Sequence, residues 1–117
     1  MAGYYQIIES SNGTANFHLR AGNHEVILAG TVHHSREEVL RTIEWIRAYA
    51  HDRSRYEPRR TVGGGRYFVL LDETGRVMGK SEVYARSSGV ETGIASVQRN
   101  GATNSFRGLV QRFAIAA

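Results

Sequence analysis

The chain of 117 residues contains no cysteine, one proline and one tryptophan. The absence of cysteine excludes disulfides, thiolate zinc sites, iron–sulfur clusters and a cysteine nucleophile. The sequence also lacks the roughly 18 consecutive apolar residues of a membrane span and the basic start and apolar run of a signal peptide. We therefore expect a cytoplasmic protein without membrane association, built as a single domain over residues 1–117.

Acidic residues are in the minority, because 15 Lys and Arg stand against 11 Asp and Glu, for a net charge of +4. Lys80 is the only lysine, so most of the positive charge is arginine, whose planar fork suits phosphates and carboxylates. The densest run, segment 53–66, contains Arg53, Arg55, Arg59, Arg60 and Arg66. These side chains would form a weak, salt-dependent nucleic-acid site if they shared one face. The alternative is a solvated connector.

The sequence repeats itself without a gap when Phe17 is aligned with Phe68, at an offset of 51 residues. Further matches include Tyr5 with Tyr56, Leu19 with Leu70, Val26 with Val77, Val39 with Val90 and Ile43 with Ile94. The matched positions are mostly apolar, spaced by two in the first part of each unit and by three to four in the second. This pattern predicts two tandem repeats with a common core, repeat one at about 3–52 and repeat two at about 54–105, followed by a tail at 106–117.

Each repeat is predicted to form three strands and a helix. Alternating or β-branched runs predict strands at 4–8, 16–20 and 25–28 in repeat one, and at 56–62, 66–70 and 76–79 in repeat two. Pro58 places the fourth of these at an edge or a bulge. Capping boxes at 35–38 and 88–91, begun by Ser35 and Ser88, predict the two helices. Residues near Phe106 begin a partial third copy, and the rest of the tail is left open between strand and short helix.

Two stretches, 84–101 with its Glu91-Thr92-Gly93-Ile94-Ala95-Ser96-Val97 segment and the hairpin 17–28, resemble the YegP family of small bacterial proteins of uncharacterised function. The resemblance covers about residues 3–105. It implies an α+β fold of tandem β-β-β-α(-β) repeats, with a single antiparallel sheet, two helices packed on one face, and C-terminal strand exchange between repeats. Repeat one departs from the pattern, because Thr42 and Trp45 stand in the helix motif and His33 stands where repeat two has Tyr84.

Candidate chemistry is sparse. His33 and His34, near Glu37, are a poor metal site, because adjacent residues on an extended chain point apart. Gly63–Gly65 is followed by a strand rather than a helix, which favours a hairpin turn over a phosphate loop. Ser88 and Ser96 lie in no nucleophile motif. We therefore expect no catalytic, cofactor-binding or metal-binding residues, and no cofactor.

The function expected from these observations is a non-enzymatic interaction module with a protein or peptide partner. Such a partner would add to the edge containing Pro58 or to the tail strand, or bind the sheet face of Tyr67, Val69, Leu71 and His18. Weak nucleic-acid binding through segment 53–66 is the alternative, and an enzyme is third. Because the second repeat is already in the chain, the protein is expected as a monomer or a homodimer.

Overall fold

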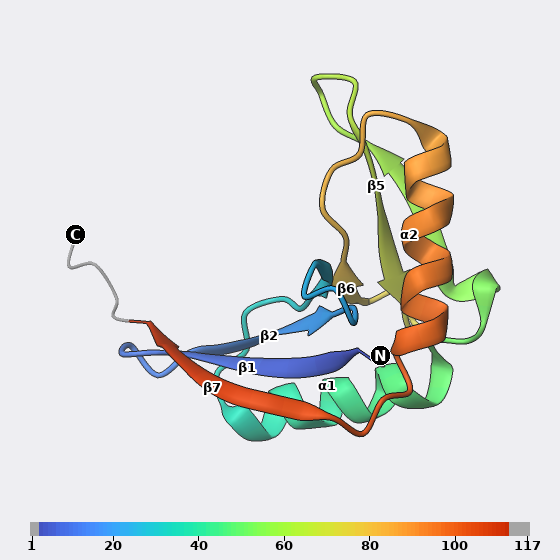
Figure 1. The fold of residues 1–117 in the computed structure, drawn as a ribbon. Helices are drawn as coiled ribbons and strands as arrows, with labels where there is room; N and C mark the ends of the chain where they lie inside the picture. The colour runs from blue at the N-terminus through green and yellow to red at the C-terminus, as the bar shows by residue number, and fades with distance from the viewer. Residues whose placement is uncertain (1–2, 113–117) are drawn as a thin grey trace.

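The computed structural model describes residues 3–112, which form one seven-stranded sheet and two α-helices (Figure 1). The elements are β1 Tyr4–Ser10, β2 Ala15–Arg20, β3 Val26–Ala29, α1 Arg36–Tyr49, β4 Tyr56–Arg60, β5 Arg66–Leu71, β6 Val77–Lys80, α2 Ser87–Asn100 and β7 Phe106–Arg112, with a short 3-10 turn at Arg53–Arg55 before β4. Residues 113–117 of the predicted tail lie outside the described residues.

The sheet has the order β4-β5-β6-β3-β2-β1-β7. Each pair of neighbouring strands is antiparallel except β1 and β7, which run parallel. The sheet is therefore mixed, and the expected wholly antiparallel sheet is wrong at this edge. In Figure 1, α1 lies below β1, β2 and β7, whereas α2 lies alongside β5, so each helix packs against one half of a strongly bent sheet.

The core forms where the apolar positions of strands and helices meet on one face of the sheet. In β2, Phe17 and Leu19 are fully buried while His18, between them, is only half-buried, as the two-residue period of a strand requires. In α1 and α2 the buried positions recur every three to four residues. Both helices share one core cluster, so the predicted α+β class with helices on one face is confirmed. Burying each large apolar side chain stabilises the fold by about 1.5–3 kcal/mol.

Matched tyrosines tie the sheet to the ends of the helices. The Tyr5 hydroxyl donates to the carbonyl of Gly101 at 2.7 Å, and the Tyr56 hydroxyl donates to the carbonyl of Ala50 at 2.5 Å. Ala50 and Gly101 are the C-cap residues of α1 and α2, and they also match at the 51-residue offset. Burial raises the pKa of both phenols, so both remain neutral donors. Thus β1 holds the same place at the end of α2 that β4 holds at the end of α1.

This placement explains the parallel strand pair. The strand that follows α1 is β4, which pairs antiparallel with β5; the strand that follows α2 is β7, and its matching place lies antiparallel to β2. That place is occupied by β1. β7 therefore lies one position further out in the same direction as β1, where the Tyr5 N–H donates to the Ser105 carbonyl at 2.9 Å. The strand expected near Phe106 is present, and it crosses from repeat two to the repeat-one half of the sheet.

The two helices begin at matching positions but are capped differently. Ser35 Oγ accepts from the Glu38 N–H at 3.2 Å, as predicted, although the Glu38 carboxylate accepts from the backbone of His34 rather than from that of Ser35. The predicted cap at Ser88 is wrong, because α2 starts at Ser87 with Arg86 as its N-cap and no side-chain cap bond. Arg86 matches Ser35 in the repeat, which leaves Ser88 free to line a groove on the surface.

Candidate functional site

Segment 53–66 does not present five free arginines. Arg53 Nη2 lies 2.9 Å from Glu91 Oε1, and Arg59 Nε lies 2.6 Å from Glu57 Oε2. Each of these arginines is next to a carboxylate that offsets its charge locally, even though an exposed pair adds little stability.

The Arg55 side chain also has partners within the protein. Its Nε lies 3.5 Å from Asp52 Oδ2, and its guanidinium carbon lies 4.4 Å from the ring centroid of Tyr49 and 5.4 Å from that of Trp45. Arg55 therefore lies against aromatic rings of α1, where a cation–π contact stabilises it.

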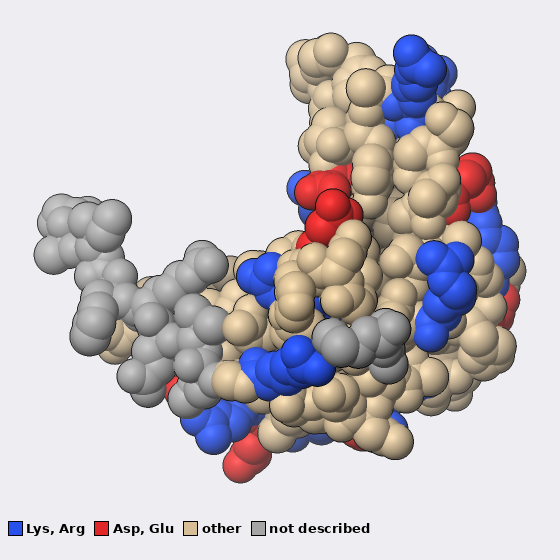
Figure 2. Space-filling view, viewed as in Figure 1, with Lys and Arg blue, Asp and Glu red and all other residues tan. Residues whose placement is uncertain are grey.

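Arg60 and Arg66, the remaining members of the segment, line a shallow hollow with Arg59 and Glu91. Figure 2 shows the basic side chains of the visible face in separate patches rather than in one continuous surface. The structure thus does not gather Arg53, Arg55, Arg59, Arg60 and Arg66 into one phosphate-binding surface, and nothing in it supports nucleic-acid binding.

The edge strand β4 offers few backbone donors for strand addition. The Thr61 N–H donates to the Gly65 carbonyl across the β4–β5 hairpin, so alternate residues, including Pro58, face outward. Pro58 has no N–H to offer there, and the N–H of Tyr56 is already bonded to the Arg53 carbonyl. An added strand would find few donors at this edge, and a partner beside Pro58 stays a prediction.

The sheet face away from the helices offers little apolar surface. Val69 is only 2% exposed, and Lys80 Nζ lies 4.9 Å from the ring centroid of Tyr67 on the same face. The half-buried side chains of His18, Tyr67 and Leu71 do alternate with the core positions as expected. On the part of the face that these side chains form, the exposed apolar surface consists of portions of Tyr67 and Leu71.

Two grooves lie on the helix side of the fold. Groove one has a volume of about 490 Å³ and is lined by His33, His34, Glu38, Arg41, Thr42, Trp45, Arg76 and Met78. Groove two has a volume of about 420 Å³ and is lined by Ala21, Asn23, Glu25, Ile27, Glu82, Tyr84, Ser88, Gly89, Thr92, Gly93, Ser96 and Arg99.

The grooves are equivalent under the 51-residue repeat, and each joins the two repeats. Groove one lies between α1 and the β6 hairpin, which supplies Arg76 and Met78. Groove two lies between α2 and the β3 hairpin, where the matched residues are Glu25 and Ile27. The sequence-based search missed both sites because it applied the repeat to core positions. Aligning the exposed positions at the same offset would have paired their linings.

The matched linings carry different chemistry. Groove one has Arg41, Arg76, His33 and Trp45 where groove two has Thr92, Glu25, Tyr84 and Ser96, in that order. The first groove therefore has two guanidinium groups and an indole, whereas the second has a carboxylate, hydroxyls and a phenol. Over the whole linings, groove one has two arginines against Glu38, and groove two has two glutamates against Arg99. The same architecture thus holds a basic groove and an acidic one.

His33 is the buried polar group of groove one. Its side chain is 5% exposed, its Nδ1 lies 3.6 Å from Glu38 Oε2, and its Nε2 has no hydrogen-bond partner. Burial lowers the pKa of His33, Arg76 lowers it further, and the Glu38 carboxylate opposes that shift. The contact is with Glu38 and not with Glu37, the acidic residue singled out from the sequence.

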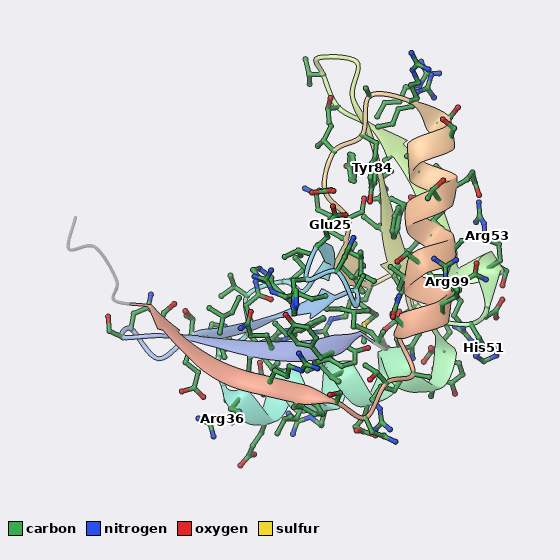
Figure 3. The ribbon with its side chains drawn as sticks, in the orientation of Figure 1. Glu25, Arg36, His51, Arg53, Tyr84 and Arg99 are labelled. Carbon is green, nitrogen blue, oxygen red and sulfur yellow. The ribbon has the colours of Figure 1, made fainter. Side chains whose placement is uncertain are left out.

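Tyr84 is the matching group of groove two, and its ring lies across two glycines of α2. A Cβ on Gly89 would lie 3.1 Å from the Tyr84 side chain, and one on Gly93 would lie 2.6 Å from the Tyr84 hydroxyl. Burial raises the pKa of Tyr84, and the carboxylates of Glu82 and Glu25 raise it further. Figure 3 shows Tyr84 and Glu25 in the inner corner of the bent molecule, where Figure 2 shows acidic atoms.

Within residues 3–112, no group of three or more histidine, aspartate or glutamate side chains is placed to hold a metal ion. Neither α-helix in that range is both long and apolar enough to span a membrane.

The fold is that of a small α+β protein with two half-sheets, each covered by one helix. The sequence pattern of a family described as "Domain of unknown function (DUF1508)" matches the chain twice, over residues 10–57 and 62–106. The chain belongs to this family.

Relatives of known sequence and structure agree. The UPF0339 protein YegP of Escherichia coli is 34% identical over 107 residues, which cover 92% of this chain and 97% of the relative. A UPF0339 protein of Shewanella oneidensis is 30% identical over 109 residues, 93% of this chain and 99% of the relative. The predicted resemblance to the YegP family is therefore confirmed.

Solution NMR structures of two such proteins share the fold. The yegP protein of E. coli superposes with a TM-score of 0.85 at 31% identity, covering 99% of this chain and 97% of that one. The S. oneidensis protein superposes with a TM-score of 0.86 at 29% identity, covering 95% of this chain and 93% of that one. The family description and the E. coli structure both state that the function is unknown.

Proposed function

We propose that the protein is a non-enzymatic binding module and that its two grooves are its ligand sites. The observation that carries this proposal is the equivalence of the grooves: one architecture forms a hollow twice, at about 490 and 420 Å³, with different linings. Volumes of this order suit small ligands or a few side chains of a peptide, since small-molecule sites typically measure about 300–1,000 Å³.

The absence of a catalytic pairing among the described residues supports binding rather than catalysis. Ser88 and Ser96 line groove two, but no histidine lines that groove beside them. Groove one has His33, but its one hydroxyl, that of Thr42, donates to the Glu38 carbonyl at 3.1 Å. Neither groove therefore has a hydroxyl nucleophile paired with a histidine base.

A protein or peptide partner would use the same hollows by inserting a side chain of opposite charge. Groove two, with Glu25 and Glu82, suits a cationic side chain, whereas groove one, with Arg41 and Arg76, suits an anionic one. In this proposal the protein acts as a monomer or a homodimer.

The test is an amide NMR titration of the labelled protein with a panel of small carboxylates, organic phosphates and amines. We expect saturable shifts confined to the linings of the grooves. The variant Ser96→Trp introduces into groove two a tryptophan at the position that matches Trp45 of groove one. The larger side chain should fill groove two and abolish the shifts at that groove alone. Saturable shifts that lie elsewhere, an absence of any saturable shift, or chemical conversion of a panel member would overturn the proposal.

A further inference from the structure

We propose that groove one binds a small oxyanion, a carboxylate or a phosphate-like group, held by Arg41, Arg76 and Nε2 of His33. This inference rests on the proposed function and deepens it by naming the ligand chemistry of one groove. Groove two, with its acidic lining, is not part of the inference and serves as its internal control.

The first observation is the unsatisfied imidazole nitrogen. His33 is only 5% exposed, yet its Nε2 has no hydrogen-bond partner in the described part of the chain. Buried polar atoms are almost always hydrogen-bonded, because leaving one unpaired costs about 1–3 kcal/mol. His33 lines groove one, and in the proposal a small rotation of its imidazole brings this nitrogen to a ligand there. Tyr84, the matched residue in groove two, has no such unpaired buried atom.

The second observation is the pair of uncommitted guanidinium groups. Over residues 3–112, neither Arg41 nor Arg76 gives its side chain to a hydrogen bond or an ion pair. The hydrogen bond from the Thr74 side chain is the main reason that the pKa of Asp72 is lowered, and the charge of the nearby Arg76 adds to that shift. The Asp72 carboxylate accepts from Thr74 and from the backbone N–H of Arg76, not from the Arg76 guanidinium. The five donors of each guanidinium are thus available in a geometry that matches a carboxylate or phosphate.

The one carboxylate in the groove is already occupied. Glu38 Oε2 accepts from the His34 N–H at 3.1 Å and faces His33 Nδ1 at 3.6 Å. The backbone bond to His34 is the main reason that the pKa of Glu38 lies below its usual range. With Arg41 and Arg76 on the same groove, the lining keeps a net positive charge while Glu38 is ionised.

Glu38 also gives His33 the orientation that an anion requires. A protonated imidazole has two N–H donors, so Nδ1 can point to Glu38 while Nε2 points to the ligand. The titratable groups that act on His33 are Glu38, Arg76 and His34, and an incoming anion adds negative charge to this set. Oxyanion binding should therefore be accompanied by proton uptake at His33 and should tighten as the pH falls.

Trp45 forms the apolar part of the groove together with Met78. It is the only tryptophan in the chain, so its fluorescence reports on groove one without labelling. In groove two the matched residue is Ser96, which makes the indole wall particular to groove one.

The experiment titrates the full chain with sodium sulfate, inorganic phosphate and sodium benzoate at constant ionic strength, following Trp45 fluorescence. Sulfate keeps its charge between pH 6 and 8, so any pH dependence of its affinity belongs to the protein. We expect a saturable change with tighter sulfate binding at pH 6 than at pH 8. Tighter binding of benzoate indicates a carboxylate ligand, and tighter binding of sulfate or phosphate indicates a phosphate-like ligand; either result supports the site.

Matched variants locate the site. Arg41→Gln and Arg76→Gln should each weaken binding about tenfold or more, since a hydrogen bond to a charged group is worth about 1.5–3 kcal/mol. His33→Gln should remove the pH dependence. Arg66→Gln and the groove-two variant Glu25→Gln are the controls, and both should leave the affinity unchanged. NMR spectra check that each variant is folded.

The inference is overturned if no saturable change occurs, if Arg66→Gln weakens binding as much as Arg41→Gln does, or if sulfate affinity is the same at pH 6 and 8. These outcomes are separable from the fate of the binding-module proposal. Amine binding confined to groove two, with no anion at groove one, would refute the oxyanion site and leave the module intact. The absence of any ligand at either groove would refute both.

Discussion

The β-carbon of Ala50 lies 2.5 Å from the point where a β-carbon on Gly101 would be. These two residues match each other in the repeat, and each caps the C-terminal end of its helix. Equivalent residues in contact mark the local two-fold relation between the repeats. Gly101 has an ordinary right-handed backbone, with φ of −62°, so the close approach and not a special conformation requires glycine there.

Gly101→Ala is therefore expected to destabilise the protein by about 1–3 kcal/mol, the usual cost of overpacking. The exchanged variant, Ala50→Gly with Gly101→Ala, should recover most of this loss, because the same contact is rebuilt with its partners reversed. Chemical denaturation of the two single variants and the double variant measures the coupling. Additive effects would contradict the predicted contact.

Gly93→Ala is expected to destabilise the protein in spite of alanine's better helix propensity. The new methyl group would meet the Tyr84 hydroxyl at 2.6 Å and the Phe68 ring at 3.0 Å. Overpacking of about 1–3 kcal/mol should outweigh the roughly 1 kcal/mol gained from propensity. Repeat one avoids the problem by pairing Thr42 with the smaller His33. Tyr84→His should thus reduce the cost of Gly93→Ala in a denaturation cycle, whereas an undiminished cost would assign the effect to Phe68 alone.

Ile7→Pro is expected to release β7 while β1 stays paired with β2. Ile7 matches Pro58, and proline is already tolerated at this outward-facing position in β4. In β1 the same change removes an N–H from the side that faces β7. Amide hydrogen exchange should become faster in residues 106–108 and remain slow in β2. Equal loss of protection in β2 would show that the strand itself had failed.

Pro58→Ile is the reciprocal change. It restores a donor at the edge of β4, and we expect the variant to self-associate through that edge, as measured by sedimentation velocity across a concentration series. Pro58→Ala, which supplies the N–H without the β-branched side chain, tests whether the backbone donor alone is enough. A Pro58→Ile variant that stays in the same oligomeric state as the parent chain would show that the charged side chains of β4 protect the edge by themselves.

The protein should become less stable as the pH decreases through the range where His33 titrates. Burial places the folded-state pKa of His33 below 6.5, its ordinary value, so the folded protein binds this proton less readily than the unfolded chain does. The contribution of the neutral imidazole is present above pH 6.5 and is lost as the pH falls from there towards the folded-state pKa. Unfolding free energies in chloride buffers from pH 8 to 5 should show this slope.

His33→Gln should flatten that slope, and Glu38→Gln should steepen it, because Glu38 is the neighbour that raises the His33 pKa. Carboxylates with lowered pKa values, such as Asp52 and Asp72, act only at lower pH and do not confuse the reading. An unchanged slope in His33→Gln would assign the pH dependence to another group.

Apolar periodicity predicted most of the fold because core positions obey simple rules. The matches of Phe17 with Phe68 and Leu19 with Leu70 are fully buried pairs in corresponding strands. The cap at Ser88 was wrong because Ser, Gly and Glu at the right spacing do not reveal that the helix has already begun one residue earlier. The parallel pairing of β7 was not predicted, because the alternation of apolar residues predicts a strand but does not show that β1 already occupies the position beside β2.

The functional surfaces were harder to predict for a physical reason. Charge in segment 53–66 depends on carboxylates such as Glu91, which is far along the chain from Arg53. The grooves combine a helix of one repeat with a hairpin of the other, so Arg41 and Arg76 meet only through the fold. The boundaries of the repeats, the compartment and the partner remain predictions.

The position of β7 outside β1 means that the sheet contains a second strand that could occupy the place of β1. Both strands run in the same direction, and the place that β1 occupies is the one that the local two-fold relation assigns to the strand after α2. If β1 were cut away, β7 could move one place inward without turning round, and the sheet would become wholly antiparallel. For protein engineers the consequence is a replaceable first strand: a foreign segment offered at that slot would compete with β7 for the edge of β2.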